Sequence, residues 1–175
     1  MNKIDTSNWK EFVLPDLFEI CGSITTQKKE LDLDSERSEE KPYPYITTAA
    51  TNNGISGWSS TYTEKGNVIT VDSAVLGVAF YQKFNFTASD HVEKLIPKFE
   101  MNENIGKFIA AVLNVNARII GYAYEEKRSQ TAMKKEKIKL PAINKLVPDF
   151  EKLAEYIYIY IYILQQKLEV STCQR

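Results

Sequence analysis

A few charged side chains in this sequence are of the types that a metal-dependent nuclease uses. Such an enzyme holds a divalent cation and the attacking water between separated carboxylates, with a lysine nearby. Asp72 or Asp90, together with Glu125 and Lys127, would supply these groups. Because 26% of the residues are charged, such a combination arises easily, and it supports a small metal-dependent nuclease only as an alternative.

A second kind of chemistry, contact with nucleic acid, is indicated by the basic segment over residues 118–139. Seven Lys and Arg residues stand there against three Glu residues. Ser129, Gln130 and Thr131 lie among the cations, and this mixture is typical of segments that contact phosphates and base edges. The alternative interpretation is a charged face that only contacts water.

A third candidate is the polar loop within YPYITTAATNNGISGW, residues 43–58. Its Asn52-Asn53-Gly54 run predicts a tight turn, because Asn and Gly tolerate positive φ. Two interpretations remain open for its many hydroxyl and amide side chains. They either satisfy one another within a hairpin loop, or they form a contact loop that reads a polar surface.

Motifs for cofactors and activated nucleophiles are absent from the sequence. It contains no GxGxxG, GxxxxGK[ST] or GxSxG pattern, and no Asn/Asp-Pro-Pro-aromatic run of an amino-methyltransferase. His91 is the only histidine, and Cys21 and Cys173 are far apart in the sequence, whereas a structural zinc site takes about four N or S ligands. We therefore predict no catalytic residues, no metal site and no cofactor.

Length and charge limit the classes of protein further. The chain has 175 residues, enough for one domain with a short appendage, and 22 Lys and Arg against 23 Asp and Glu. This balance excludes a polycation that coats nucleic acid by charge alone. Residues 19–40, with seven acidic and three basic side chains, nevertheless oppose the basic segment. The two cysteines favour a reducing cytoplasm, and neither a signal peptide nor a membrane span is expected.

Strands and helices alternate among the elements that would position these side chains. A strand followed by a helical turn at residues 16–19 is expected where Pro15 interrupts WKEFVLPDLFEI. Residues 66–97 are typical of several strands, and the 3.6-residue period of residues 102–120 predicts an amphipathic helix. Asn102 or Asn104 would cap this helix and Gly121 would end it.

The C-terminal segment carries two conflicting periods. Its YIYIYIYI core alternates like a strand, whereas the flanking DFEKLAE and LQQKLE have helical spacing. Pro148 and Asp149 form a helix start signal, so we predict one helix from about Asp149 to Val170, roughly 33 Å long. Its middle is apolar on all sides, and it must be covered by the domain, a partner chain or both.

In their order along the chain, these segments resemble a target recognition domain from the specificity subunit of Type I restriction-modification enzymes. They also resemble the single-domain form in Type IIB and Type IIG systems similar to the BcgI specificity subunit. The segments that carry the resemblance are WKEFVLPDLFEI, YPYITTAATNNGISGW, GVAFYQKFNFTASDHVEKLIP, NENIGKFIAAVLN, GYAYEEKRSQTAMKKEKIKLP and PDFEKLAEYI. Each is weakly specific, but their order and spacing agree from about Trp9 to Leu168.

The resemblance implies an α+β fold with a single globular mixed α/β recognition domain over residues 1–147. A coiled-coil-like dimerisation helix would occupy residues 148–175. A full specificity subunit has two such domains with two helices, so this chain is expected to act as a half-subunit that forms a homodimer on a bipartite target. The partners implied are double-stranded DNA, a DNA methyltransferase (modification) subunit and, as a further candidate, a restriction subunit. Catalysis would belong to those subunits.

Base-reading positions vary within the family, so the contacts are predicted by position. We expect Arg128 to bind guanine, while Gln130, Asn52 or Asn53 pairs with adenine. The predicted DNA-binding residues are Thr47, Thr48, Asn52, Asn53, Ser73, Lys127, Arg128, Gln130, Lys134 and Lys135, the last two at phosphates. The predicted partner interface is Phe150, Leu153, Ile157, Tyr160, Leu164 and Leu168. The alternatives are the small nuclease and a protein-interaction module that uses the aromatic C-terminal helix without DNA.

Overall fold

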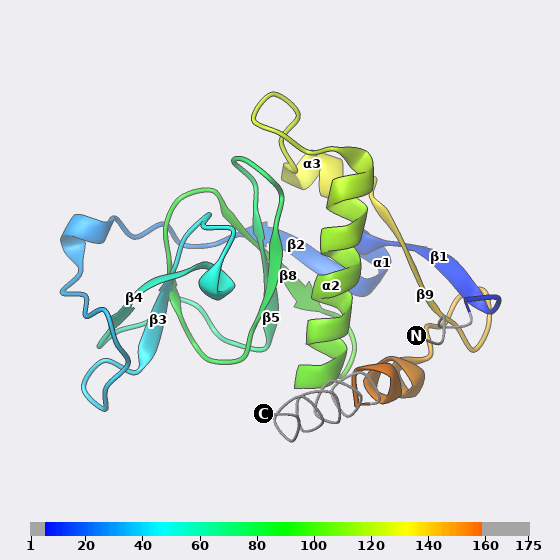
Figure 1. Cartoon of the computed structure of the whole chain (residues 1–175), viewed down its shortest axis with the longest axis horizontal. Helices are drawn as coiled ribbons and strands as arrows, with labels where there is room; N and C mark the ends of the chain where they lie inside the picture. Colours follow the sequence, from blue (N-terminus) through cyan, green and yellow to red (C-terminus); the bar gives the residue numbers. More distant parts are fainter. Residues whose placement is uncertain (1–5, 159–175) are drawn as a thin grey trace, which may run out of the picture.

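The computed structural model describes residues 6–158, which fold into three small sheets and one long helix (Figure 1). Mixed α and β elements were predicted, and this α+β class is confirmed. The strands are β1 (Trp9–Val13), β2 (Phe18–Gly22), β3 (Tyr43–Ile46), β4 (Ile55–Ser59), β5 (Val68–Asp72), β6 (Ala79–Gln82), β7 (Thr87–Ala88), β8 (Val92–Pro97) and β9 (Lys137–Pro141). The helices are α1 (Leu14–Leu17), η1 (Lys28–Glu30), η2 (Asn52–Gly54), α2 (Glu103–Ile120), α3 (Gln130–Met133) and the helical residues 150–158.

The central sheet has four strands in the order β2-β8-β5-β6, and all its neighbouring strands are antiparallel. A second sheet pairs β1 with β9, and a third has the order β4-β3-β7 with β3 and β7 parallel. The strand β6 is therefore an edge strand of the central sheet. No helix in the described part of the chain has both the length and the hydropathy of a membrane span.

Near the N-terminus the predicted strand and helical turn are present, with the turn two residues earlier than expected. Pro15 lies in the first turn of α1, where its missing N–H costs nothing, and Val13 before it is extended. The backbone N–H of Phe18 then donates to the carbonyl of Leu14 and ends the helix. Phe18 consequently begins β2 instead of continuing the helical turn.

The helix α2 confirms the prediction for residues 102–120. The Asn102 side chain accepts from the Ile105 N–H at 3.0 Å, and Gly121 ends the helix with a φ of 81°. The apolar face of the helix is buried against the central sheet, and Ile109 and Leu113 are fully covered. A Cβ at Gly106 would lie 2.3 Å from the Tyr81 ring, so this glycine lets α2 approach β6 closely.

The free edge of β6 is satisfied by a side chain of α2. Asn114 accepts from the Ala79 N–H at 2.7 Å and donates to the Ala79 carbonyl at 2.9 Å. These two hydrogen bonds replace those that a further strand would make. The edge of the central sheet is thus closed by a helix at this point.

The helical residues 150–158 pack on the same core as the rest of the domain. Leu153 is fully buried in the main apolar cluster, and the Phe150 ring stacks on Phe99 with centroids 4.1 Å apart. Ile157 is partly buried against that cluster, and Tyr156 contacts the rings of Trp9 and Phe108.

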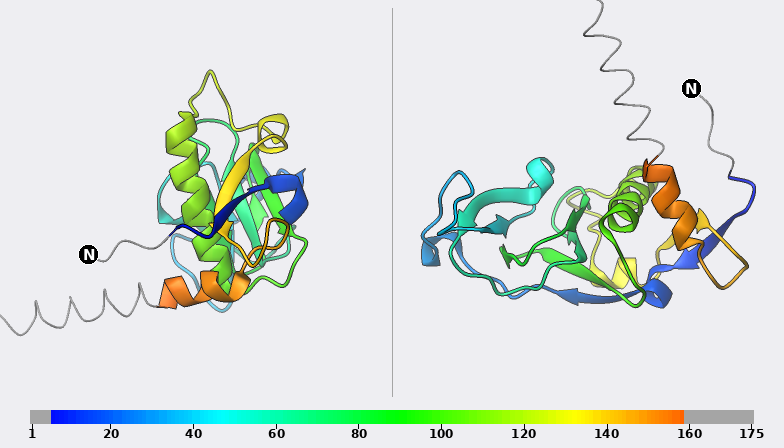
Figure 2. Two further views of the ribbon diagram at one scale, coloured as in Figure 1. Left: turned by 90° about the vertical axis from the view of Figure 1, so that its right-hand side faces the viewer. Right: turned by 90° about the horizontal axis from the view of Figure 1, so that it is seen from below.

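This packing corrects part of the predicted partner interface. Phe150, Leu153 and Ile157 were expected to face a partner, but they contact the chain's own core because the helix crosses one end of α2 (Figure 2, left). Tyr160, Leu164 and Leu168 lie outside the described residues.

Candidate nucleic-acid interface

The polar loop between β3 and β4 contains the turn that the sequence predicts. Asn52, Asn53 and Gly54 all have left-handed backbones, with φ values of 51°, 54° and 76°. The Thr47 N–H donates to the Gly54 carbonyl at 2.8 Å and closes the loop. A Cβ at Gly54 would lie 3.1 Å from the Thr47 carbonyl oxygen, so both the φ and the space favour glycine.

The side chain of Asn53 fastens this loop to the end of β6. Its Nδ2 donates to the Tyr81 carbonyl at 3.3 Å and to Gln82 Oε1 at 3.0 Å. In return, Gln82 Nε2 donates to the Asn53 carbonyl at 3.1 Å. Asn53 was predicted to pair with adenine, but the structure engages its amide within the protein.

The other predicted loop residues differ in their exposure and contacts. Asn52 is exposed, and its Nδ2 donates to the Ile55 carbonyl at 3.1 Å. Thr48 is half-buried at the base of the exposed tip of residues 49–52. The Thr47 hydroxyl is used within the loop, since its Oγ1 lies 2.9 Å from Ser56 Oγ and also contacts the Gly54 carbonyl. The outward-facing polar groups therefore come from the tip.

A groove of about 430 Å³ runs beside this loop, between η2 and α2. Figure 2 (right) shows that η2 and α2 stand on the same side of the central sheet. The lining includes amide, aromatic and cationic side chains, among them Asn53, Trp58, Phe80, Lys83, Lys107 and Asn114. Such a mixture of flat rings, amides and cations suits contact with a nucleic acid.

Positive charge borders the groove. Lys83 Nζ and Lys107 Nζ each lie 2.7 Å from one carboxylate oxygen of Glu103. The hydrogen bonds from Lys107 and then Lys83 lower the pKa of Glu103 to about 2, so this carboxylate stays ionised near neutral pH. The three groups together keep one net positive charge.

Arg37 adds a further cation beside two rings that line the groove. Its guanidinium lies 4.8 Å from the centroid of the Phe84 ring and 5.8 Å from that of Trp58. Cation–π contact of this kind orients an exposed arginine while leaving hydrogen-bond donors free.

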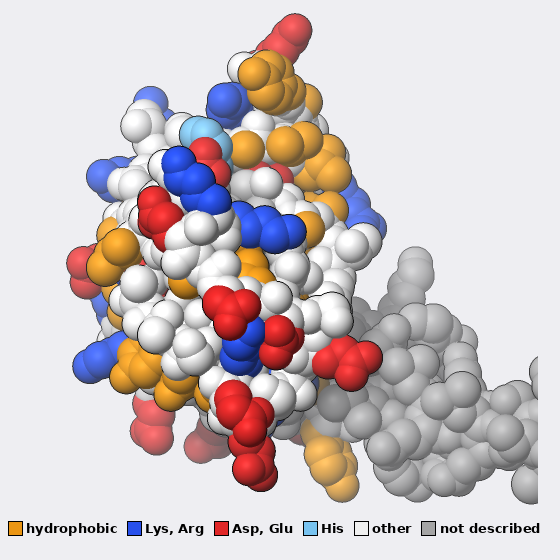
Figure 3. Space-filling view, turned by 90° about the vertical axis from the view of Figure 1, so that its left-hand side faces the viewer, with side chains coloured by type: hydrophobic (Ala, Val, Ile, Leu, Met, Phe, Trp, Pro, Cys, Tyr) orange, Lys and Arg blue, Asp and Glu red, His pale blue; other side chains and the backbone are white. Residues whose placement is uncertain are grey.

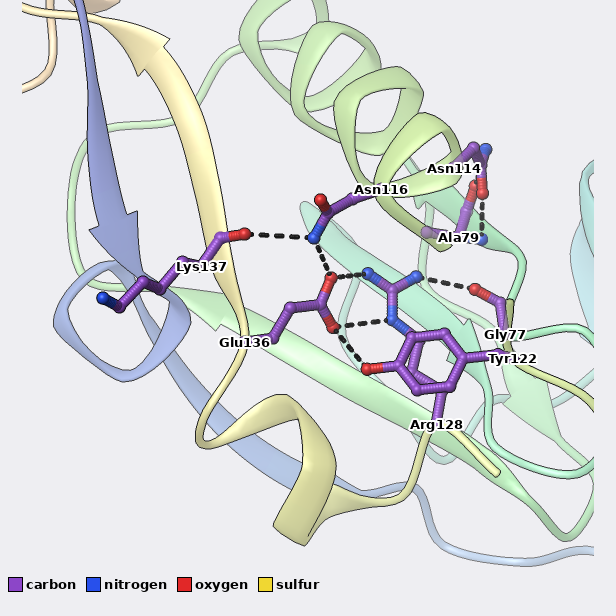
Figure 4. Close-up of polar contacts among 8 residues, drawn as sticks. All are labelled: Gly77, Ala79, Asn114, Asn116, Tyr122, Arg128, Glu136 and Lys137. Atoms are coloured by element: carbon purple, nitrogen blue, oxygen red, sulfur yellow. Dashed lines mark hydrogen bonds and ion pairs between the residues drawn. The ribbon is translucent and has the colours of Figure 1, made fainter. Parts of the chain in front are cut away.

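Arg128, the predicted guanine contact, lies inside the protein (Figure 4). Its side chain is 0% exposed. Nε and Nη2 donate to the two carboxylate oxygens of Glu136 at 3.0 and 2.6 Å, and Nη1 donates to the Gly77 carbonyl at 2.6 Å. The prediction of a base contact is therefore wrong for this residue, because its guanidinium is used to join segments of the fold.

Glu136 is the centre of this buried network. It also accepts from Asn116 Nδ2 at 2.8 Å and from the Tyr122 hydroxyl at 3.3 Å. Burial, and then the charge of Glu136, raise the pKa of Tyr122, so its hydroxyl remains a donor at neutral pH. The network ties α2, the loop after it and the entry to β9 to the β5–β6 turn.

The predicted residues around α3 belong to a different surface from the polar loop. Ser73 is buried and donates to Glu93 Oε1 at 3.2 Å, while Gln130 Nε2 donates to Glu93 Oε2 at 2.8 Å. A shared carboxylate thus brings these two residues together. Figure 2 (right) places α3 on the opposite side of the molecule from η2.

The predicted lysines near α3 are exposed. Lys134 and Lys135 lie at the surface after this helix, and Lys127 Nζ lies 4.9 Å from the Tyr124 ring centroid. The candidate DNA-binding residues therefore divide between a loop surface beside α2 and an α3 surface behind the sheet.

The acidic segment forms another part of the exterior. Glu30, Asp32, Asp34, Glu36, Glu39 and Glu40 are exposed, and Lys41 pairs with Asp32 and Asp34 at 2.8 and 2.9 Å. Figure 3 shows acidic side chains gathered over the lower part of one face. A polyanion is expected to avoid these carboxylates, and Arg37 is the cation of this segment whose guanidinium lies over the Trp58 and Phe84 rings.

Comparison with known proteins gives the family of the chain. Residues 6–170 match the model of the Type I restriction modification DNA specificity domain. The chain belongs to this family. This specificity domain is 28% identical over 168 residues to the Type II restriction enzyme BcgI specificity subunit from Heyndrickxia coagulans. The match covers 93% of the chain and 47% of that subunit, so the chain spans about half the length of this curated relative.

Solved structures share the fold of the specificity domain. The S subunit of a Type I restriction-modification system from M. genitalium superimposes with a TM-score of 0.63 at 18% identity, over 95% of the chain and 42% of that subunit. The HsdS subunit from Thermoanaerobacter tengcongensis superimposes with a TM-score of 0.61 at 9% identity, over 99% of the chain and 41% of that subunit.

The carboxylates considered for a nuclease have other roles in this specificity domain. The Asp72 carboxylate accepts from the backbone N–H groups of Ala74, Val75 and Leu76 at 2.7, 3.2 and 2.9 Å, so it holds the β5–β6 turn. Asp90 lies 3.7 Å from His91. Over residues 6–158, no group of three or more His, Cys, Asp or Glu side chains could hold a metal ion.

Several residues of the loop surface were missed by sequence reasoning. Arg37, Lys83 and Lys107 lie in three separate segments and share no local motif. Only the approach of α2 to β6 brings the two lysines to one carboxylate. The one available signal was the interleaving of Lys83 with Phe84 in YQKFNF, which is typical of aromatic and basic nucleic-acid surfaces.

Proposed function

We propose that this chain reads a specific sequence in double-stranded DNA as the specificity component of a restriction-modification enzyme. In this proposal the chain itself is not catalytic, and methyl transfer and cleavage belong to partner subunits. Membership of the specificity-domain family supports it, as does the similarity to the BcgI specificity subunit. The structural observation that carries it is a polar loop hydrogen-bonded to β6 beside a groove lined in part by Lys83 and Lys107. Arg37 lies over two rings of the same groove.

The two kinds of group would divide the work of recognition. Cations near the groove would contact phosphates and set the position of the duplex, while the exposed loop tip would reach base edges. Asn52 and Thr48 are the proposed base contacts, since Asn53 and Thr47 support the loop from within. Lys127, Lys134 and Lys135 are the proposed phosphate contacts of the alternative placement, in which DNA lies on the α3 surface.

We propose a DNA methyltransferase subunit and a second copy of this chain as partners, with a restriction subunit as a further candidate. A second groove, of about 620 Å³, lies between α2 and the β1–β9 pair. Its lining includes Val115 and Ile119, and Ile119 is 77% exposed. Tyr156 contacts Trp9 and Phe108, which also line this groove, so a second copy would extend an apolar surface that the helical residues 150–158 already use.

The DNA proposal is tested by the salt dependence of duplex binding. The full chain should bind one duplex sequence more tightly than others, and log K should fall linearly with log salt concentration. Replacing one phosphate contact should reduce that slope by about 1 without changing sequence preference. We expect this result for Lys83→Gln and Lys107→Gln.

Lys134→Gln is the matched variant on the α3 surface. A slope that responds only to Lys134→Gln would place DNA on that surface instead of the loop surface. Binding that is absent at low salt would contradict the DNA function and favour the protein-interaction module.

A further inference from the structure

We infer that Asn53 and Gln82 are positioning residues that fix which base the tip of the β3–β4 loop reads. The inference rests on the proposed DNA-reading function and goes beyond it, since it assigns part of the specificity to two side chains that would not touch DNA.

The loop backbone needs an external support. Three consecutive residues, Asn52 to Gly54, have left-handed backbones. This conformation is unfavourable for residues with a Cβ, and two of the three are asparagines. Asparagine tolerates this conformation better than most residues but does not select it strongly. Contacts from outside the turn therefore hold one conformation, and these contacts come from Thr47 at the start of the loop and from β6.

The support is buried and extends into the central sheet. Gln82 is 2% exposed, and its Nε2 donates both to the Asn53 carbonyl and to Thr70 Oγ1, the latter at 2.9 Å. Thr70 Oγ1 in turn donates to the Phe80 carbonyl at 3.3 Å. The position of the loop is thereby coupled to β5 and β6, which are rigid parts of the fold.

The side chains of the tip make few contacts with the rest of the fold, and the hydrogen bond from Asn52 to the Ile55 carbonyl is the exception. Among the described residues, the side chains of Thr48 and Thr51 make no hydrogen bond, and Ala49 and Ala50 are exposed. Polar groups that are free, but carried on a fixed backbone, can select a base at little entropic cost. Without the Asn53–Gln82 pair, the same tip groups would be present in many orientations.

Asn53→Gly removes the side-chain support of the loop but keeps the turn. Glycine adopts positive φ without strain, so the turn remains accessible while the Nδ2 donor is removed. Gln82→Met is a second variant, which keeps the length of the side chain but removes its amide. His91→Gly is the matched control, because His91 also has a positive φ of 59° and lies in a different loop.

The experiment selects bound sequences from a library of duplexes with random positions, using the full chain. It also measures the affinity and salt slope of each variant on one fixed duplex outside the selected motif, together with its thermal midpoint. We expect His91→Gly to select the wild-type motif. Asn53→Gly and Gln82→Met should lose about tenfold or more of the preference at one or two adjacent bases. Preferences at other positions, non-specific affinity and salt slope should be unchanged.

Two results would overturn the positioning role. One is a wild-type motif at every position for folded Asn53→Gly and Gln82→Met. The other is a uniform loss of affinity across all sequences with no change in relative preference. Failure of the proposed function would give a different result, because the wild-type chain would then select no motif at all. That result would contradict the positioning role as well.

Discussion

At the scale of single residues, the buried ion pair of Arg128 and Glu136 acts as one unit. Three guanidinium nitrogens and both carboxylate oxygens have partners within hydrogen-bond distance. A charge pair buried in this way adds little net stability compared with apolar side chains, but either charge alone is costly to bury. Its value lies in fixing how four segments meet.

Arg128→Met should therefore lower stability without altering base preference. Because Glu136 would be left buried and unpaired, we expect the free energy of unfolding to fall by about 3–5 kcal/mol. The double variant Arg128→Met with Glu136→Leu should recover much of this loss. Urea titration followed by circular dichroism measures both. The role is contradicted if the single variant is as stable as Lys127→Ala, an exposed neighbour, and has altered base preference.

The sequence could not distinguish a buried Arg128 from an exposed one. The residue lies within KRSQ, a run that looks solvated, and its burial depends on Gly77, which is 51 positions away. Asn52-Asn53-Gly54 is the opposite case, because positive φ follows from the local residue types. Local chemistry was thus predictable from the sequence, and chemistry set by distant contacts was not.

At the scale of elements, α2 both fills the core and closes the edge of β6. Its period and its two caps followed from the sequence, since both are local properties. Which strand the helix would cover did not follow, because Asn114 and Ala79 are 35 residues apart. The same limit explains the error in the predicted partner interface. The apolar side of the C-terminal helix was assigned to a partner, although its described turns cover the chain's own core.

Asn114→Ala should loosen the contact between α2 and β6. Both polar backbone groups of Ala79 would lose their partner, so we expect a loss of about 2 kcal/mol in the free energy of unfolding. The Ala79 amide should also exchange with deuterium faster than in the wild type. Asn104→Ala, on the same helix, is the matched control and should leave Ala79 protected. Equal exchange rates in the two variants would contradict the edge-closing role.

At the scale of the whole molecule, the acidic segment and the apolar groove beside α2 occupy different areas. The acidic side chains of residues 30–40 are exposed, and Figure 3 shows acidic side chains gathered over the lower part of one face. The apolar groove beside α2 was not expected, because Val115 and Ile119 continue the helical pattern that also fills the core. Only the structure shows which apolar residues of α2 lie outside the core.

The proposed homodimer makes a prediction at this scale. Ile119→Glu should place a charge in the groove and convert a dimer into a monomer, measured by light scattering during size-exclusion chromatography. Leu146→Glu is the matched control, since Leu146 is 86% exposed but does not line the groove. It should remain dimeric. A wild-type monomer, or a dimer that survives Ile119→Glu, would contradict the use of this groove by a second copy.

The attachment of the β3–β4 loop also affects how this protein can change. Thr47, Asn53 and Gly54 hold the frame of the loop, whereas Ala49, Ala50 and Thr51 contribute exposed side chains that the frame does not use. Substitutions at these three tip positions leave the anchoring bonds in place, so the cost to folding is small. Under the proposed function, new base preferences would therefore be sampled at the tip while the scaffold stays the same.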